Sequence, residues 1–280
     1  MTSRGDLPFA FDPTKDAHAY FLGLLATDGT IYESSRNRGR VSFELKASDE
    51  AVLRSLAEHI PYRSHFRYRC RTTNFAGRYE SVILTFHDLR FRRELSALGY
   101  VSGKKCETTT TPRCEYDETG LWRGVVDGDG SLGITGVDQP FVSLVTASQR
   151  LRDAYIDFVA RVAGTRPDPK RNARDQVFNI VVFNEPAQLL VARLYAEATI
   201  SIPRKACSAN LVRAWHRPTN RKRICFERRR WTPEEDRRVL EQLPQAVVAA
   251  ELGRTVQSIS VRRWRLRCSV VEDAERSLPS

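Results

Sequence analysis

One short pattern occurs twice in this chain, and its repetition limits the folds that the chain can adopt. The pattern is a glycine, four residues and then Asp-Gly, and it closes two apolar stretches, "AYFLGLLATDGT" and "GLWRGVVDGDGSLG". The first copy has Gly23 and Asp28, the second has Gly124 and Asp129, and the two acids lie 101 positions apart. A repeat of this length predicts two similar halves packed about a pseudo-twofold axis.

The same order of elements follows each copy of the pattern. In the first half, strands are predicted over 29–35, 40–48, 64–72 and 79–86, and helices over 49–60 and 88–99. In the second half, strands are predicted over 131–135, 140–148 and 176–184, and helices over 148–164 and 185–198. Each half is therefore predicted to be αββαββα, and the expected fold class is α+β.

The glycines of the pattern indicate how the two halves meet. Gly23 and Gly124 lack a Cβ, so the two helices that carry them can approach closely along that face. Gly29 and Gly130 directly follow the acids, where a left-handed residue commonly ends a helix. We therefore expect the two helices to pack together and to end side by side near the pseudo-twofold axis.

The two acids are poorly placed for a protein without a cation nearby. The C-terminal end of a helix carries partial negative charge, so Asp28 and Asp129 would each add a like charge to a negative helix end. Carboxylates and backbone carbonyls are hard oxygen ligands that suit Mg²⁺. A lone Asp-Gly is more often a simple helix cap or turn, and it is the duplication that favours a metal site.

Residues 15–216 resemble a single-chain LAGLIDADG homing endonuclease, because both motifs and the order of elements between them match. The resemblance implies two halves that form a DNA-binding saddle, and a Mg²⁺-dependent break in both strands of a long DNA target. It implies that Asp28 and Asp129 each serve one scissile phosphate, and that the backbone carbonyls of Thr27 and Gly128 are further metal ligands. The first half departs from the second at an inner motif position, where it has Ala26 and the second half has Asp127.

One lysine follows each acid at nearly the same distance. Lys105 lies 77 positions after Asp28, and Lys205 lies 76 positions after Asp129. Each lysine is a candidate for stabilising developing charge or polarising the attacking water. A phosphate clamp and a solvated lysine at a helix start are the alternatives, and Lys104 or Arg204 could take the place of its neighbour.

Basic side chains alternate along several predicted strands, which is the pattern expected of a DNA-reading sheet. Period-two alternation places such side chains on one face, where Arg can read guanine and Gln can read adenine. A phosphate contact or a solvated sheet face is the alternative for any single arginine. The candidates in the two halves are Arg38, Arg40, Lys46, Arg67, Arg69, Arg71, Lys170, Arg171, Arg174 and Gln176.

The chain after Trp215 changes in composition and reads as a separate domain. Residues 217–268 hold 14 Lys and Arg against 6 Asp and Glu. Helices are predicted near 233–243, 245–252 and 255–266, and the segment resembles a Myb/SANT-like helix-turn-helix with Trp231 and Trp264 in its core. That resemblance implies possible groove contacts by Gln257, Ser258, Arg262 and Arg263, with a protein-binding SANT module as the alternative.

These observations divide the chain into four parts with different roles. The predicted boundaries are 15–113 for the first repeat, 114–216 for the second, 217–230 for a basic linker and 231–268 for the helix-turn-helix domain. The net charge of +11 suggests a polyanionic partner, with a basic surface that serves solubility as the alternative. We expect a cytoplasmic monomer that binds double-stranded DNA, needs Mg²⁺ and does not associate with a membrane.

Two other functions are compatible with the same residues. The first is a transcription regulator in which a homing-type fold binds DNA without cutting it, and the second is an RNA-splicing maturase on this fold. Retention of both acids favours the nuclease over the regulator. The five histidines form no HNH or HxxxH pattern, which argues against a histidine-dependent nuclease.

Overall fold

The computed structural model describes residues 10–73, 77–103, 110–172, 175–218 and 230–276, apart from the side chains of residues 73, 77–78 and 267–276. The chain forms two compact units, residues 1–217 and 218–280. Over the described ranges, none of the helices combines the length and the apolar character that crossing a membrane requires.

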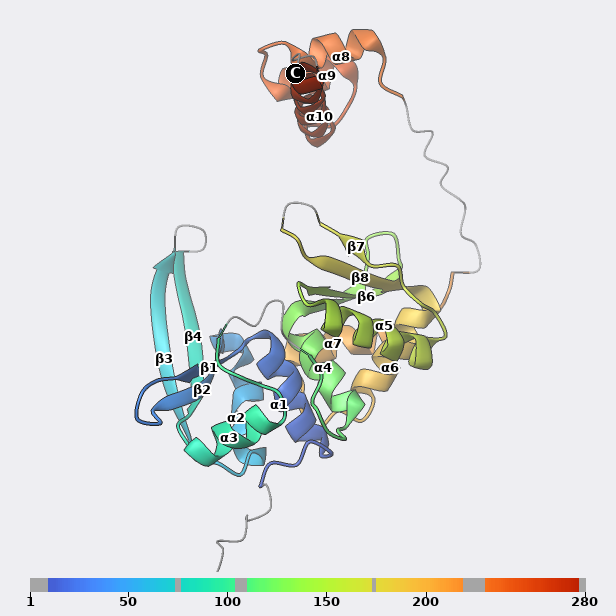
Figure 1. Ribbon diagram of the computed structural model, residues 1–280. Coiled ribbons are helices and arrows are strands. Elements are labelled where there is room, and N and C mark those ends of the chain that lie inside the picture. The colour runs from blue at the N-terminus through green and yellow to red at the C-terminus, as the bar shows by residue number, and fades with distance from the viewer. Residues whose placement is uncertain (1–9, 74–76, 104–109, 173–174, 219–229, 277–280) are drawn as a thin grey trace, which may run out of the picture. The chain divides into compact units, whose positions relative to one another are not determined.

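The first half of the larger unit has the predicted order of elements (Figure 1). Its four strands form an antiparallel sheet in the order β1-β2-β4-β3. The elements are α1 (Asp16–Thr27), β1 (Gly29–Glu33), β2 (Gly39–Lys46), a 3₁₀ turn (Ala47–Asp49), α2 (Glu50–His59), β3 (Ser64–Thr73), β4 (Gly77–Phe86) and α3 (Leu89–Ala97).

The second half repeats this plan and confirms the predicted αββαββα order. Its sheet has the matching strand order β5-β6-β8-β7. An additional helix, α7, follows the repeat and was not predicted. The elements are α4 (Glu118–Asp129), β5 (Gly130–Ile134), β6 (Pro140–Thr146), α5 (Gln149–Ala163), β7 (Lys170–Arg171), β8 (Phe178–Phe183), α6 (Asn184–Tyr195) and α7 (Pro203–Arg213).

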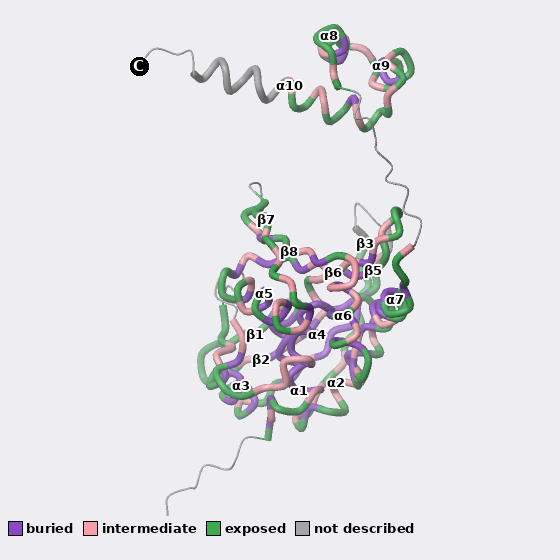
Figure 2. The backbone as a smooth tube through the Cα atoms, turned by 90° about the vertical axis from the view of Figure 1, so that its right-hand side faces the viewer, coloured by how far each residue is buried: buried purple, intermediate pink, exposed green. Residues whose placement is uncertain are grey.

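Helices α1 and α4 pack against each other at the centre of this unit, as the glycines of the motif predict. A Cβ on Gly23 would lie 2.8 Å from the Val125 nitrogen, and a Cβ on Gly124 would lie 2.8 Å from the Leu24 nitrogen. The two glycines also face one another, because a Cβ added to either one would lie 3.0 Å from the Cα of the other. Buried residues concentrate around this helix pair (Figure 2), where one continuous hydrophobic core joins both halves.

The glycines after the two acids have a different role from the one predicted. Neither adopts a left-handed conformation: Gly29 begins β1, and Gly130 is extended with φ −96° and ψ 173°. A Cβ on Gly29 would lie 2.9 Å from the Phe43 ring, and one on Gly130 would lie 2.9 Å from the Ser143 oxygen. Glycine is favoured at both sites because the preceding helix lies even closer: a Cβ on Gly29 would be 2.7 Å from Leu25 Cα, and one on Gly130 would be 2.6 Å from the Val126 oxygen.

The smaller unit holds three helices at the predicted places. They are α8 (Pro233–Leu240), α9 (Gln245–Leu252) and α10 (Val256–Arg276), of which the last is longer than expected. Thr232 and Glu235 form a capping box at the start of α8. Gly253 ends α9 in the left-handed conformation with φ +58°, where glycine is favoured. The core is Val239, Val248, Ala249 and Ile259.

Trp264 was predicted to lie in the core of this unit, and that prediction is wrong. Its side chain is 66% exposed on α10, whereas Trp231 packs against the core beneath the guanidinium of Arg254. Ile259 of the same helix is fully buried, and Trp264 is five positions later, which places it on a different face of the helix.

Candidate functional site: the helix seam and its two sheets

The two motif acids lie together where α1 and α4 end. Asp28 caps α1, with its backbone N–H donating to Leu24 O at 3.0 Å, and Asp129 is the last residue of α4. The Asp28 carboxylate reaches across to the end of α4, where its Oδ2 lies 3.2 Å from the place that a Cβ on Gly128 would take. The two acids therefore lie together where the paired helices end, as the sequence predicts, and we call this junction of α1 and α4 the seam.

Their closeness has an electrostatic consequence. Desolvation by the surrounding protein, followed by the charge of Asp28, raises the pKa of Asp129 to about 6. The positive charge of Lys205 acts in the opposite direction. Like charges held this way favour a bound cation, because the cation offsets the repulsion between the carboxylates.

Lys205 lies at this site, although it is neither solvated nor exposed. Its side chain is buried, and its ammonium donates to the backbone carbonyls of Val126 (2.6 Å), Asp127 (2.5 Å) and Gly130 (2.9 Å). Burial lowers the pKa of Lys205 to about 8, against the influence of the nearby acids. The ammonium therefore ties the end of α4 to the start of α7. Its neighbour Arg204 is exposed and pairs with Asp49 at 3.2 Å, and the predicted Lys105 and its neighbour Lys104 lie outside the described residues.

Asp127 is part of this site in a way that sequence reasoning missed. It is buried and accepts hydrogen bonds from Tyr20 Oη (2.7 Å), Tyr195 Oη (2.6 Å) and the backbone N–H of Ile202 (2.8 Å). Ile202 is the N-cap of α7, so the Asp127 carboxylate fixes the start of the helix that carries Lys205. The only sign of this role in the sequence is that an acid directly follows the apolar residues of "GVVD". The hydrogen-bond donors of Asp127 lie 68 to 107 positions away, so local sequence does not reveal them.

The donors at the seam fit a hard divalent cation better than a softer metal. The described residues contain no group of three or more His, Cys, Asp and Glu side chains that could hold a metal. An ion would therefore be held by the two carboxylates, with backbone carbonyls, water and phosphate oxygens as the other ligands, which suits Mg²⁺. The participation of the Thr27 and Gly128 carbonyls stays a prediction.

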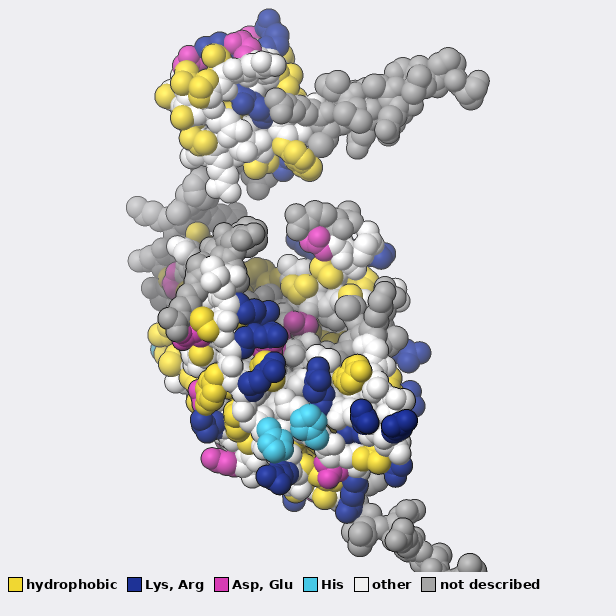
Figure 3. Space-filling view, turned by 90° about the vertical axis from the view of Figure 1, so that its left-hand side faces the viewer, with side chains coloured by type: hydrophobic (Ala, Val, Ile, Leu, Met, Phe, Trp, Pro, Cys, Tyr) yellow, Lys and Arg dark blue, Asp and Glu magenta, His cyan; other side chains and the backbone are white. Residues whose placement is uncertain are grey.

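A groove on the outer face of the first sheet begins at Asp28. Its volume is about 550 Å³, and the predicted Arg40, Arg67 and Arg69 line it together with other residues of β1, β2, β3 and β4. The pairing of β3 with β4 explains this arrangement, since Arg67 is opposite Ile83 and His65 is opposite Thr85. On the side of the molecule where β3 lies, Lys and Arg side chains form a band beside neighbouring His side chains (Figure 3). The remaining lining residues are Thr30, Ser42, Glu44, Phe66 and His87.

The other basic candidates of the first half lie around this groove. Arg71 is on the same face of β3 and pairs with Glu44 at 2.6 Å, while Arg69 is 3.5 Å from that carboxylate. Arg38 is exposed in the turn before β2, and Lys46 is exposed at the end of β2. The groove face thus carries more positive than negative side chains, with Glu44 positioning two of the arginines.

The candidates of the second half are more dispersed. Lys170 is exposed on β7 opposite Asn179, whereas Arg171 points to the other side of the strand, with its guanidinium 5.6 Å from the Phe178 ring centre. Gln176 lies in the turn before β8 with φ +56°, and Arg174 is outside the described residues. Strand alternation therefore separates Lys170 from Arg171, which the sequence prediction had grouped.

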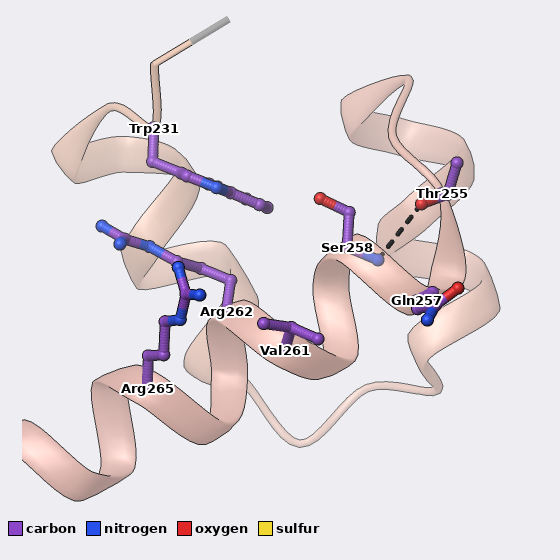
Figure 4. Close-up of a pocket in the computed structure, with 7 residues that line it drawn as sticks. All are labelled: Trp231, Thr255, Gln257, Ser258, Val261, Arg262 and Arg265. Carbon is purple, nitrogen blue, oxygen red and sulfur yellow. Dashed lines mark hydrogen bonds between the residues drawn. The ribbon is translucent and has the colours of Figure 1, made fainter. Parts of the chain in front are cut away.

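In the smaller unit, two of the four predicted contact residues have structural partners. Arg262 pairs with Asp236 at 2.6 Å, and Arg263 donates to the carbonyl of Val239 at 2.6 Å at the end of α8. Gln257 and Ser258 line a shallow pocket of about 290 Å³ on α10 (Figure 4), together with Trp231, Thr255, Val261, Arg262 and Arg265. Arg265, which was not predicted, is exposed beside them.

The architecture, two αββαββα halves joined along a glycine-packed helix pair, is that of the homing endonucleases. The solved structure of the homing endonuclease I-WcaI bound to its DNA recognition sequence is similar at 15% identity and a TM-score of 0.50, over 70% of this chain and 87% of that chain. The meganuclease I-SmaMI bound to uncleavable DNA shares 11% identity, covers 69% of this chain and 88% of its own, and has a TM-score of 0.45. Full-length DUF199/WhiA from Thermatoga maritima shares 11% identity at a TM-score of 0.42, over 98% of this chain and 96% of that chain.

In sequence, no protein-family model and no curated protein matches the chain. The likeness to I-WcaI shows the fold of the larger unit.

Proposed function

We propose that this protein is a site-specific DNA endonuclease that cuts both strands of a long target with Mg²⁺. The observation that carries the proposal is the pair of acids at the α1–α4 seam, where the charge of Asp28 helps to raise the pKa of Asp129 to about 6. A protein without a cation partner gains nothing from that repulsion. The basic groove that starts at Asp28 supports DNA as the ligand, because Arg-lined surfaces bind phosphate and guanine.

Each part of the site has a distinct task in this proposal. Bound Mg²⁺ would supply a Lewis acid and an activated water for phosphodiester hydrolysis. Asp28 serves one strand and Asp129 serves the other. Lys205 holds the carbonyls at the end of α4 in place and adds positive charge beside the acids.

We further propose that the smaller unit lengthens the recognised DNA. Its last helix begins with exposed polar side chains, Gln257 and Ser260, and Arg265 is exposed two turns later. Arg262 and Arg263 instead contact α8, through Asp236 and the Val239 carbonyl, and so hold the two helices together. The excess of Lys and Arg in residues 217–268 favours DNA over a protein partner.

A cleavage assay on a library of duplex targets tests the nuclease proposal. Wild-type protein with Mg²⁺ should cut both strands, Asp28→Asn and Asp129→Asn should each nick one strand, and the double variant should not cut. Asp168→Asn, an exposed aspartate in the loop after α5, is the matched control and should cut normally. Binding without cleavage by the wild-type protein in Mg²⁺ and in Mn²⁺ would contradict the nuclease and support a regulator. Tighter binding of single-stranded RNA than of the selected duplex would support a maturase.

A further inference from the structure

The two sheets have the same topology, but their outer faces differ in chemistry. On the first sheet, four consecutive outward positions of β3 are His65, Arg67, Arg69 and Arg71, and all four side chains are exposed. Neighbouring β2 adds Arg40 to the same face. This face is therefore rich in hydrogen-bond donors with positive charge.

The matching face of the second sheet carries fewer basic side chains and more apolar ones. The positions that alternate with its buried residues form three cross-strand rows, which the pairing registers align. Phe183 is 45% exposed and Val145 is 39% exposed on this face. Lys170 is the single basic residue among these aligned positions. The rows are Gly133, Phe141 and Phe183; Ser131, Ser143 and Val181; and Val145, Asn179 and Lys170.

Both faces continue directly from the acids at the seam. Thr30 is two residues after Asp28 and lines the groove with it. Ser131 is two residues after Asp129 and is exposed at the matching place on β5. The two sheets rise on either side of the α1–α4 pair (Figure 1). A duplex that lies across both acids therefore passes over both faces. Because the second face continues from Asp129 as the first continues from Asp28, we assign DNA as the ligand of the second face as well.

We infer that the two halves read the two half-sites by different chemistry. The first half reads guanine through arginine donors, and the second half reads A·T pairs through apolar contact with thymine C5-methyl groups, aided by Asn179. The inference rests on the proposed function and specifies the DNA sequence class of that site. The target is then guanine-rich in the half under β3 and thymine-rich in the half under β6 and β8.

The removal of thymine methyl groups tests this inference without changing the protein. The full-length chain, with metal chelated so that bound DNA is not cut, selects duplexes from a random-sequence library. Arg67→Ala identifies the first half-site, because its guanine preference should fall there and nowhere else. Deoxyuridine then replaces thymidine in one half-site of the selected duplex at a time, which deletes only the methyl groups.

We expect about a fourfold loss of affinity for each methyl removed from the second half-site, and an unchanged affinity when the first half-site is substituted. Equal effects in the two halves, or no effect in the second, would overturn the inference while leaving the nuclease proposal intact. A library from which no sequence is enriched would instead count against the proposed function itself. Sedimentation equilibrium adds a separate test: a dimer that Phe183→Ser abolishes, with DNA affinity unchanged, would show that a second copy covers this face.

Discussion

At the scale of single residues, the two halves of the seam are unequal. Asp127 accepts three hydrogen bonds in a buried position, and one of them comes from the N-cap of the helix that carries Lys205. Ala26 occupies the corresponding place in the first half and accepts none of these bonds through its side chain. The second half therefore has a carboxylate that positions its lysine by way of α7, and the first half lacks this carboxylate.

The substitution Asp127→Ala should both destabilise the protein and bias cleavage. It leaves three buried donors without their acceptor, and a single unsatisfied group costs about 1–3 kcal/mol, so we expect a loss of about 3 kcal/mol or more in the free energy of unfolding. Because α7 loses its tie to α4, cutting by Asp129 should slow more than cutting by Asp28. Urea denaturation measures the first effect, and duplexes labelled on one strand measure the second. Equal slowing of both strands would mean that Asp127 acts on stability alone.

The pKa of Asp129 predicts how stability depends on pH in the metal-free protein. Because its folded pKa of about 6 lies above the unfolded value of 3.8, the native state binds more protons between those values. The contribution of Asp129 to stability is therefore lost as pH rises from about 4 to about 6. In EDTA, Asp129→Asn should melt at a higher temperature than wild type at pH 7, with a gap that narrows toward pH 4.

Two comparisons check the origin of that gap. Adding Mg²⁺ at pH 7 should raise the melting temperature of the wild type more than that of Asp129→Asn, because a ligand that binds the native state stabilises it. Asp168→Asn removes one negative charge elsewhere and should show no gap of this kind. A gap that stays constant from pH 4 to pH 7 would contradict the proposed repulsion.

At the scale of elements, the α1–α4 pair fixes where the acids meet. Its close approach depends on the absence of side chains at two positions, Gly23 and Gly124, each of which faces backbone atoms of the other helix. Backbone cannot move aside as the end of a long side chain can. The distance between the helix axes, and with it the separation of the two acids, is thus set by these two glycines.

The substitution Gly124→Ala should consequently disturb the whole larger unit. The added Cβ would lie 2.8 Å from the Leu24 nitrogen, so the helices must separate and the core must repack. We expect the free energy of unfolding to fall by about 3 kcal/mol or more, and the affinity for Mg²⁺ to be weaker. Gly136→Ala is the matched control, because no atom lies within 4 Å of its added Cβ. Calorimetric melting and metal titration compare the variants, and wild-type values for Gly124→Ala would mean that the glycine contact does not set the seam.

The sequence predicted the elements that depend on local pattern and short motifs. The strand alternation of residues 64–72 placed Arg67 and Arg69 on one face, and the repeated motif placed Asp28 and Asp129 at one seam. The hydrogen bonds of Asp127 and the burial of Lys205 could not be predicted, because they join α4 to residues about 70 to 110 positions away. Gly29 and Gly130 were expected to be left-handed helix ends, because the close contacts that each makes with the preceding helix and the next strand are visible only in the fold.

At the scale of the whole molecule, each unit has its own hydrophobic core. The larger core is built around α1 and α4, and the smaller one is a cluster of four buried residues among α8, α9 and α10. The two units also differ in the groups that they hold: the proposed catalytic acids lie in residues 1–217, and residues 230–276 of the smaller unit contain no comparable pair of acids at paired helix ends. We therefore expect that removing the smaller unit would weaken DNA binding and leave DNA cleavage by the larger unit in place.

Truncation after Arg217 tests that separation. We expect residues 1–217 to fold, because they contain the complete larger core, and to keep Mg²⁺-dependent cutting. Their affinity for the target should fall, and the slope of log K against log salt should become smaller, since the basic segment contributes phosphate contacts. Binding titrations at several salt concentrations measure both quantities. An unchanged slope would indicate that the smaller unit binds something other than DNA.

The joining of both sheets in one covalent chain has a consequence for how such a protein can change. A dimer of identical subunits has two identical binding surfaces. A duplex that contacts both surfaces equally well must therefore have the same sequence in its two halves, that is, a palindrome. Here the face beside β3 and the face beside β8 already carry different side chains, and a mutation in one leaves the other untouched. A ligand that spans both faces therefore need not have a palindromic sequence. Each half of that ligand can change during evolution without a matching change in the other half.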